Sequence, residues 1–564
     1  MIVLISYSIV FLLFGVNSMK SIDSTISIDN IQIECDAIST HSDFGRRFCF
    51  YRHIKIEPTT RVTVMENPIA NEKNELIFDN CTLFTLPSGI FVQFPHIRTV
   101  YVWNVQLQLV KPEIFQNAKE LSMLDLSRNR IEHLVAHTFS LAPNLKHLDL
   151  TKNLIRTIDV NTFSGLKHLN VLKLNENQLT LMPANVFAPL PQLKTIRLNH
   201  NSIKTIPLEL FAENVQLENI FLNDNAIEWM VGEQTFRHLN SVGEFDLHNN
   251  PILNLNCCVI NAESIDIRHT NARCCYIGKR TKRIFANDNR ISIIDIENNS
   301  TQLQHLELAN NKLTQMTPLT IHFNQMKHLD LSNNNQIADI GLNSFANMKQ
   351  LDLLNLRNSG LRRIYFGSFS HKSQLKRLDI SYNQLNRIDF RMFVSMPNLR
   401  SLYLDGNNLS DIDMTEIRNV FPSLTKIGIS NNNWTCDNLA SVIKYLDSNA
   451  IEIDSDGIVK NHENIKGIPC NNINSIDLDA IEKLVNYNND NKNITSTSME
   501  TENGTSLKIV SVPENEPKVK HECKSEMELI IRLLDLKYQS QNTIDNARLV
   551  AEKVDNMIDL LNVP

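Results

Sequence analysis

The chain has 564 residues, of which 42% are hydrophobic and 21% are charged. This composition supports a large buried core and excludes a chain that is disordered throughout. The 55 basic and 62 acidic residues give a net charge of -7, which argues against a protein that binds nucleic acid by neutralising phosphates.

The N-terminus is typical of a secretory signal peptide. Ile2 to Phe14 is mostly apolar, and Val16-Asn17-Ser18 follows it as a candidate cleavage site. A membrane anchor is the alternative, but 13 residues are too short to cross a bilayer. We therefore expect residues 1–18 to be removed and the mature protein to be secreted. No later apolar run reaches 18 residues, so no membrane span is expected.

Seven N-x-S/T sequons are compatible with a secreted glycoprotein, although an Asn-rich chain produces some of them by chance. The candidate glycosylation sites are Asn80, Asn298, Asn299, Asn408, Asn433, Asn493 and Asn503.

A repeat with a step of 24 residues dominates residues 76–434, in about fifteen copies. Its pattern is L-x-L-x-x-N-x-L, as in Leu124-Leu126-Asn129-Ile131 and, one step later, Leu148-Leu150-Asn153-Ile155. A Phe follows in each copy, at Phe91 and every 24 residues as far as Phe211, and then less regularly to Phe393. Self-similarity at such a period indicates a solenoid.

This pattern resembles the leucine-rich-repeat family, which implies an α/β solenoid with the shape of a horseshoe. The alternating Leu residues point into a shared core from a short strand, and the strands of successive coils pair in parallel. The Asn side chain turns inward, where its amide can bond backbone groups of neighbouring coils. Cys81 and Ser359 replace this Asn, so we expect Cys81 to be a buried thiol.

Both ends of a solenoid expose core residues unless they are capped. Segment 19–75 contains Cys35 and Cys49 and resembles the N-terminal cap of extracellular family members. Segment 435–470 contains Cys436 and Cys470 and resembles the C-terminal cap, although that cap normally carries four Cys. We expect an intrachain disulfide in each cap.

The repeat is irregular in residues 253–305, which contain the doublets Cys257-Cys258 and Cys274-Cys275. Structural zinc usually takes a C-x2-4-C spacing, so two disulfides between the doublets are favoured over a zinc site in an oxidising compartment. The basic run Lys279 to Arg283 follows. It is interpreted as a solvated loop, with an anionic docking patch or a protease-sensitive site as alternatives.

Residues 471–522 have the composition of a flexible linker, since 13 of the 21 residues from Asn486 to Ser506 are Asn, Ser or Thr. Residues 523–562 follow a heptad pattern in which eight of ten a and d positions are apolar. This pattern predicts a short coiled coil, and an amphipathic helix folded back on the solenoid is the alternative.

Cys523 remains after the other cysteines are assigned, and it lies seven residues before the a position Ile530. An unpaired Cys in a secreted protein indicates intermolecular pairing or a reactive thiol. We expect an interchain disulfide at Cys523. No motif of a hydrolase, metalloprotease or nucleotide-binding enzyme occurs in the sequence, and the 17 His are dispersed. We therefore expect no catalytic residues, no metal site, no cofactor and no enzymatic activity.

The order of these parts resembles the mosquito leucine-rich immune proteins. The resemblance rests on the Cys doublets, Cys523 and the helix from Lys524 to Leu561. It implies a scaffold in the haemolymph that is disulfide-linked to a second leucine-rich-repeat protein. Such a complex stabilises a thioester-containing complement-like protein and delivers it to pathogens. Here the coiled coil is short and the doublets lie within the repeats, so the partner can differ.

The alternative function is that of a receptor-like or matrix protein that resembles a Toll-type ectodomain and binds a ligand on its concave face. Aromatic residues occur at outward strand positions, although scattered exposed aromatics are common in any protein. The candidates are Tyr101, Trp103, Phe221 and Tyr403.

Overall fold

The computed structural model describes residues 28–31, 48–52, 54–57, 61–64, 74–230, 236, 238–252, 260–297, 302–314, 323–337, 340–341, 344–454 and 464–471. The chain divides into two compact units, Met1–Ile476 and Asp477–Pro564. The predicted signal peptide, linker and coiled coil all lie outside the described residues. The first unit contains the repeats.

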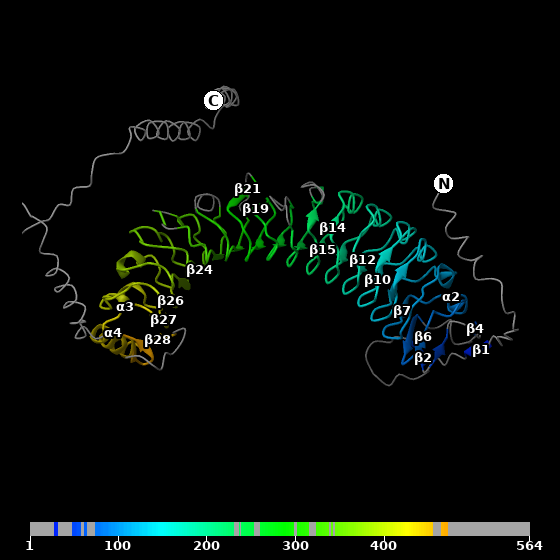
Figure 1. The fold of residues 1–564 in the computed structure, drawn as a ribbon, viewed down its shortest axis with the longest axis horizontal. Helices are drawn as coiled ribbons and strands as arrows, with labels where there is room; N and C mark the ends of the chain where they lie inside the picture. Colours follow the sequence, from blue (N-terminus) through cyan, green and yellow to red (C-terminus); the bar gives the residue numbers. More distant parts are fainter. Residues whose placement is uncertain are drawn as a thin grey trace, which may run out of the picture. The chain divides into compact units, whose positions relative to one another are not determined.

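One parallel sheet runs through the first unit, and each of its strands pairs with the strand of the next coil. Figure 1 shows these strands following one another along an arc, with the sheet on its inner side. In order, they are β2 (Phe48–Arg52), β5 (Glu75–Asp79), β7 (Thr99–Tyr101), β8 (Met123–Asp125), β10 (His147–Asp149), β12 (Val171–Lys173), β13 (Thr195–Arg197), β15 (Asn219–Phe221), β17 (Glu244–Asp246), β18 (Ser264–Asp266), β20 (Arg283–Phe285), β22 (His305–Glu307), β23 (His328–Asp330), β24 (Leu353–Asn355), β25 (Arg377–Asp379), β26 (Ser401–Tyr403), β27 (Lys426–Gly428) and β28 (Glu452–Ile453). This arrangement confirms the predicted solenoid.

The register of the sheet matches the period of the sequence. Leu148 of β10 lies beside Leu124 of β8 and Leu172 of β12, and all three side chains are buried. Because side chains alternate along a strand, the middle residue of each short strand points into the core and the two flanking residues point out. The inner face of the arc, called here the concave face, is therefore made of the first and third residues of the strands.

The far side of the coils is built from turns, short helices and strands of two to four residues. The Phe side chains of successive coils pack there in a column, and the Phe139 and Phe163 rings, for example, lie 6.3 Å apart and nearly parallel. The helices are α2 (Ile90–Gln93), η2 (Pro112–Phe115), η4 (Phe390–Phe393) and α3 (Ile417–Val420). The parallel strand pairs are β1 (Ile28–Ile31) with β4 (Arg61–Val64), β3 (Lys55–Ile56) with β6 (Thr82–Leu83), β9 (His133–Leu134) with β11 (Thr157–Ile158), β14 (Thr205–Ile206) with β16 (Trp229–Met230), and β19 (Cys274–Ile277) with β21 (Ile293–Ile296).

The repeated Asn residues connect the coils, as the sequence predicts. The Asn177 amide donates to the carbonyl oxygens of Leu150 in the preceding coil and Leu174 in its own coil, both at 3.0 Å. Its oxygen accepts from the backbone N–H of Ile155 at 3.1 Å. One side chain therefore satisfies backbone groups that the turn would otherwise leave buried and unpaired.

The irregular middle of the sequence keeps the fold but shortens the coils. Strands β17, β18, β20 and β22 begin at residues 244, 264, 283 and 305, so some steps fall to about 20 residues. The sheet continues through them without a break, since Ile265 lies beside both Phe245 and Ile284. The far side of these coils includes the β19–β21 strand pair. The solenoid therefore continues through the segment in which the sequence repeat is irregular.

A helix closes the C-terminal end of the solenoid. Helix α4 (Cys436–Ser448) begins at the cap residue Thr435 and buries Leu439, Val442, Ile443 and Leu446 against the last coil. Trp434 is fully buried, and its indole N–H donates to the Ile429 carbonyl at 2.7 Å. The antiparallel pair β29 (Asn464–Ile465) and β30 (Ile468–Pro469) follows. Across the described segments, every helix is too short or too polar to cross a membrane.

Candidate binding face

The concave face carries a column of side chains at the third strand position. It is acidic or aromatic in most coils, with a basic section at β12 and β13. From β8 to β26 the residues are Asp125, Asp149, Lys173, Arg197, Phe221, Asp246, Asp266, Phe285, Glu307, Asp330, Asn355, Asp379 and Tyr403. Because strands in a sheet lie about 4.8 Å apart, residues in neighbouring coils can form direct contacts.

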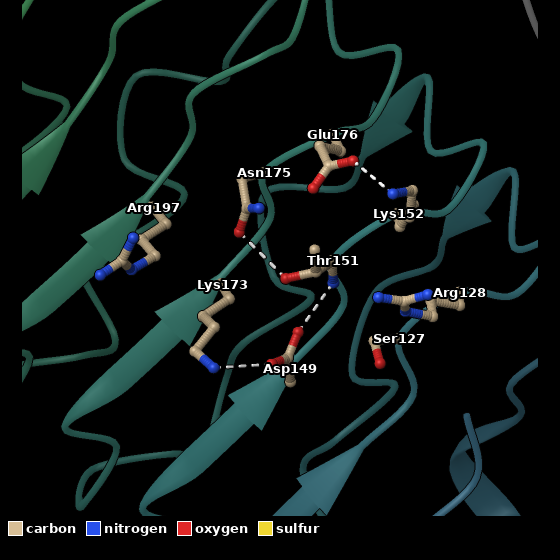
Figure 2. Close-up of a pocket in the computed structure, with 9 residues that line it drawn as sticks. All are labelled: Ser127, Arg128, Asp149, Thr151, Lys152, Lys173, Asn175, Glu176 and Arg197. Atoms are coloured by element: carbon tan, nitrogen blue, oxygen red, sulfur yellow. Dashed lines mark hydrogen bonds and ion pairs between the residues drawn. The ribbon is translucent and has the colours of Figure 1, made fainter. Parts of the chain in front are cut away.

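A polar hollow of about 340 Å³ lies where the basic section meets Asp149, at the ends of β8, β10, β12 and β13. Figure 2 shows its side chains, with Lys173 reaching across to Asp149. Its lining consists of Ser127, Arg128, Asp149, Thr151, Lys152, Lys173, Asn175, Glu176 and Arg197. Four of these are cationic and two are anionic at neutral pH, so the hollow has a positive excess.

Ion pairs connect several of the side chains that line the hollow. Lys173 Nζ lies 2.8 Å from Asp149 Oδ2, and the Thr151 backbone N–H donates to Asp149 Oδ1 at 2.9 Å. Burial acts to raise the pKa of the Asp149 carboxyl, but the hydrogen bonds from Lys173 and Thr151 outweigh it and bring the pKa below its ordinary value. Lys152 pairs with Glu176 at 3.0 Å. The guanidinium of Arg197 is instead stacked on the Phe221 ring, 4.3 Å from its centroid.

The four predicted aromatic candidates lie on the concave side, but they do not form one platform. Tyr101 and Trp103 contact each other edge to face with centroids 5.7 Å apart, and Trp103 is 38% exposed. Phe221 lies several strands away beneath Arg197. Tyr403 lies near the C-terminal end, where Arg377 covers its ring and its hydroxyl donates to Asp454. Only Tyr101 and Trp103 can contact one ligand together.

The middle coils present acidic residues and histidines that the sequence analysis did not assign to a site. His248 Nδ1 lies 2.6 Å from Asp246 Oδ1. The Arg268 guanidinium makes a bidentate ion pair with the two carboxylate oxygens of Asp266. In the next coils, His305 Nε2 lies 2.7 Å from Glu307 Oε1 and its ring stacks on His328. A single repeat reveals these groups only in part, because His305 and Glu307 share one strand while His328 comes from the next coil.

The basic run after the second Cys doublet is paired with acids. Lys279 lies 3.0 Å from Glu297, while Arg280 and Lys282 both contact Glu263, at 3.3 and 2.8 Å. Thr281 is buried within the same turn. These contacts neutralise much of the positive charge, which favours the solvated-loop interpretation over an anionic docking patch.

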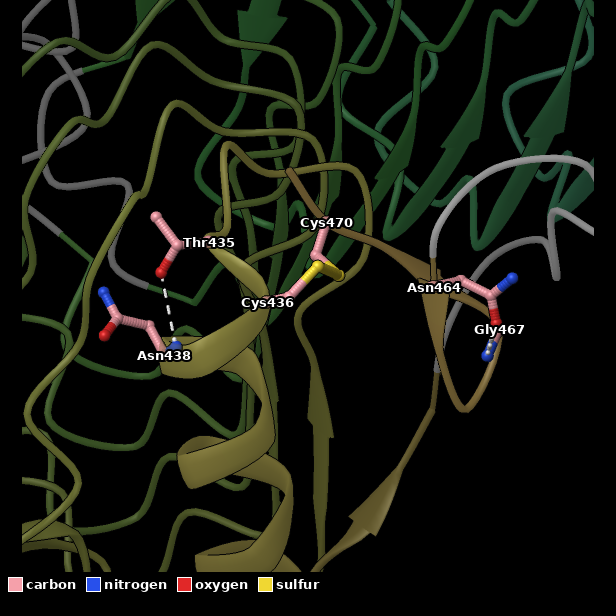
Figure 3. The surroundings of a disulfide bond; sticks show 6 residues. All are labelled: Thr435, Cys436, Asn438, Asn464, Gly467 and Cys470. Atoms are coloured by element: carbon pink, nitrogen blue, oxygen red, sulfur yellow. Dashed lines mark hydrogen bonds between the residues drawn. A yellow bond between two sulfur atoms is a disulfide. The ribbon is translucent and has the colours of Figure 1, made fainter. Parts of the chain in front are cut away.

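The C-terminal cap contains the predicted disulfide. Cys436 Sγ and Cys470 Sγ are bonded at 2.05 Å, at the start of α4 (Figure 3). The bond ties the capping helix to the segment that returns after β30. Thr435 Oγ1 caps the helix by accepting from the Asn438 backbone N–H at 3.3 Å.

The prediction for the Cys doublets is wrong at Cys275. Cys274 is disulfide-bonded, so it is not a zinc thiolate, but Cys275 is a free thiol in the hydrophobic core. Neighbouring residues of a strand point to opposite sides, so the two cysteines of β19 cannot face one partner doublet. Burial raises the pKa of the Cys275 thiol to about 12, which makes it unreactive. Cys81 is likewise a buried thiol outside any disulfide, as predicted.

The remaining predicted site residues are described only in part. Asn80, Asn408 and Asn433 are exposed, as glycosylation requires. Cys49 lies in β2, of which only the backbone is described. The others lie outside the described residues: Cys35, Cys257, Cys258, Asn298, Asn299, Asn493, Asn503 and Cys523.

Comparison with known proteins agrees with the repeat architecture. The family model for the leucine-rich repeat matches residues 95–155, 143–203, 191–252 and 351–409, on both sides of the shortened coils. No curated protein sequence matches the chain significantly.

Solved structures with a similar fold include the LRIM1/APL1C complex, with a TM-score of 0.54 and 18% identity over 94% of this chain and 83% of that chain. The TLR13–ssRNA13 complex has a TM-score of 0.51 and 20% identity over 70% of this chain and 54% of that chain. At these identities the similarity concerns the fold. By its repeats and its fold, the chain is a leucine-rich-repeat solenoid.

Proposed function

We propose that this protein is a secreted innate-immune binding scaffold that forms a disulfide-linked complex with a second leucine-rich-repeat protein. In this proposal the complex stabilises a thioester-containing complement-like protein in the haemolymph and delivers it to pathogens. The fold similarity to the LRIM1/APL1C complex supports the proposal, because that solved structure joins two proteins. A large concave face of mixed charge, with aromatic side chains in some coils, is suited to binding proteins.

The observation that carries the pairing proposal is the state of the described cysteines. Cys436 and Cys470 are bonded to each other, Cys274 is disulfide-bonded, and the reduced thiols of Cys81 and Cys275 are buried in the core. None of these five can reach a second chain. An interchain disulfide therefore has to use another cysteine, and Cys523 is the one that lies at the start of the predicted helix.

The test is electrophoresis of the secreted full-length chain, produced with and without a candidate leucine-rich-repeat partner. We expect a high-mass species without reductant that collapses to the monomer when reductant is added. Cys523→Ser should abolish this species and leave the unfolding curve of the solenoid unchanged. Cys258→Ser serves as the matched variant, because the first doublet, like Cys35, lies outside the described residues and is another possible source of a thiol. Loss of the species in Cys258→Ser alone would contradict pairing through Cys523.

A receptor-like function is the second candidate, and the pair Tyr101 and Trp103 favours it. An exposed Trp beside a Tyr on a concave sheet can anchor a peptide or another apolar ligand. If this function holds, the secreted protein is a monomer without reductant, and Trp103→Ala weakens ligand binding. Val135→Ala is a suitable control, because Val135 is 44% exposed but lies outside the strands of the concave sheet.

A further inference from the structure

Three side chains in the middle of the concave face can offer ligand atoms to one metal ion. His305 and Glu307 are the first and third residues of β22, and His328 is the first residue of β23. The parallel register pairs His305 with His328, whose rings stack with centroids 4.1 Å apart. The nitrogen and oxygen ligand atoms of the three residues all lie within 4.8 Å of one another.

We propose that His305, Glu307 and His328 form a Zn²⁺ site with one coordination position open toward the concave face. Two imidazoles and a carboxylate are a ligand set that zinc accepts together with a water or an external ligand. In a tetrahedral site, bonds of 2.0–2.2 Å place the ligand atoms roughly 3.3 Å apart. To admit the ion, the contact of 2.7 Å between His305 Nε2 and Glu307 Oε1 therefore has to lengthen, and the His328 ring, which is stacked on His305, has to turn toward the same point.

Neighbouring side chains hold the ligands in place. Glu307 Oε2 accepts a hydrogen bond from the Asn287 amide at 2.8 Å, which leaves Oε1 as the oxygen that turns toward the histidines. The Phe285 ring packs 5.0 Å from the His305 ring. Partners of this kind fix the orientation of metal ligands and raise the affinity of a site. The His305 and Glu307 side chains are 25% and 22% exposed, so an ion can reach them from solvent.

The charge states at neutral pH suit metal binding. The hydrogen bond with His305 is the main cause that lowers the pKa of the Glu307 carboxyl, which is therefore ionised. Burial and the charge of His305 lower the pKa of the His328 imidazole, which is therefore neutral. A deprotonated carboxylate and a neutral imidazole are the forms that bind zinc.

The surrounding charges modulate the site. Asp330 lies beside Glu307 in the register and Asp352 adds negative charge near His328, so both favour a cation. Arg283 lies beside His305, and Arg268 also carries charge near Glu307. These two positive charges weaken the attraction of the site for a metal ion. Arg268 does not pair with Glu307, because its guanidinium is bound to Asp266 instead.

A second cluster of Asp246, His248 and Asp266 has similar spacing but is a poorer candidate. It offers one imidazole, that of His248, where the His305 cluster offers two. The carboxylate of Asp266 is occupied by the guanidinium of Arg268, whose Nη2 lies 2.6 Å from Asp266 Oδ2. A metal ion would have to displace this cation, which makes the His305 cluster the preferred site.

The test is calorimetric titration of Zn²⁺ into the secreted full-length chain after treatment with a chelator. We expect saturable binding of one ion per chain, weaker in His328→Gln and in Glu307→Gln by at least about tenfold. His147→Gln is the matched control, because His147 also occupies the first position of a concave-face strand, β10, but belongs to neither cluster.

Several results would overturn the proposal: no saturable binding by the parent chain, equal affinity in His328→Gln and the parent, or a loss confined to His248→Gln. Unfolding curves of all variants in the presence of chelator show whether a lost site reflects a lost fold. Because Glu307→Gln preserves the shape of the side chain, it separates loss of the ligand from loss of packing.

Discussion

The side-chain amide of Asn153 donates to the carbonyl oxygen of Leu126, which belongs to the preceding coil, at 2.9 Å. The Asn153 oxygen also accepts from the backbone N–H of Ile131 at 3.1 Å. The residue is nearly fully buried. The stability of each coil therefore depends on a side chain of the next coil, and the solenoid cannot be divided into independent units.

Asn153→Ala should destabilise the protein by roughly 1–3 kcal/mol, because it leaves buried backbone groups without partners. Chemical denaturation of the parent and the variant measures this difference. Asn144→Ala is the control, because the Asn144 amide also donates to a carbonyl of the preceding coil, that of Lys119, but in an exposed position. Equal losses in the two variants would contradict a special role for the buried ladder.

Leu174→Ala should cost on the order of 2–5 kcal/mol, as truncation of a fully buried Leu does in a rigid core. Leu174 is 0% exposed, whereas Leu181 in the following turn is 66% exposed. Leu181→Ala removes the same atoms and should change the free energy of unfolding by less than about 0.5 kcal/mol. Thermal unfolding of both variants compares the two positions, and similar losses would contradict the inward register of the repeat.

The sequence predicts the repeated parts of this fold well, because a period of 24 residues specifies both the buried Leu positions and the Asn ladder. From the sequence we predict disulfides for both cysteines of the doublet Cys274-Cys275. Adjacent residues of a strand face opposite sides, however, and Cys275 lies in the core as a thiol. The cluster of His305, Glu307 and His328 was not anticipated, since it depends on which coils become neighbours. In a solenoid, binding residues spread over several coils leave no compact motif in the sequence.

A lysine lies in the core of the C-terminal coils. Lys372 occupies the position three residues after the column Phe, where other coils have Leu166 or Leu190, and it is 0% exposed. Its ammonium has a single weak hydrogen bond, to the His371 carbonyl at 3.5 Å. Burial, with a smaller contribution from Lys349, lowers the pKa of Lys372 from 10.5 to about 8. At neutral pH the folded protein therefore carries a poorly solvated charge.

Lys372→Met should stabilise the protein, on the order of 1–3 kcal/mol near neutral pH. Between about 8 and 10.5 the unfolded chain binds more protons at Lys372 than the folded protein, so the parent loses stability as the pH falls through this range. The advantage of the variant should therefore shrink toward the upper end of that range. Chemical denaturation of the parent and the variant at a pH of about 8 and at a pH of about 10.5 measures the difference in the free energy of unfolding. Lys376→Met is the control, because the Lys376 side chain is exposed.

The thiols can be counted by alkylation, which tests the placement of the second Cys doublet. In the native protein Cys81 and Cys275 should resist alkylation, because both are buried and burial raises the pKa of each thiol. In denaturant without reductant both should react, while Cys274, Cys436 and Cys470 should stay blocked until reductant is added. Peptide mass spectrometry identifies each alkylated residue. If Cys275 also requires reductant, the doublets form two disulfides after all, and β19 has a different register from the one described above.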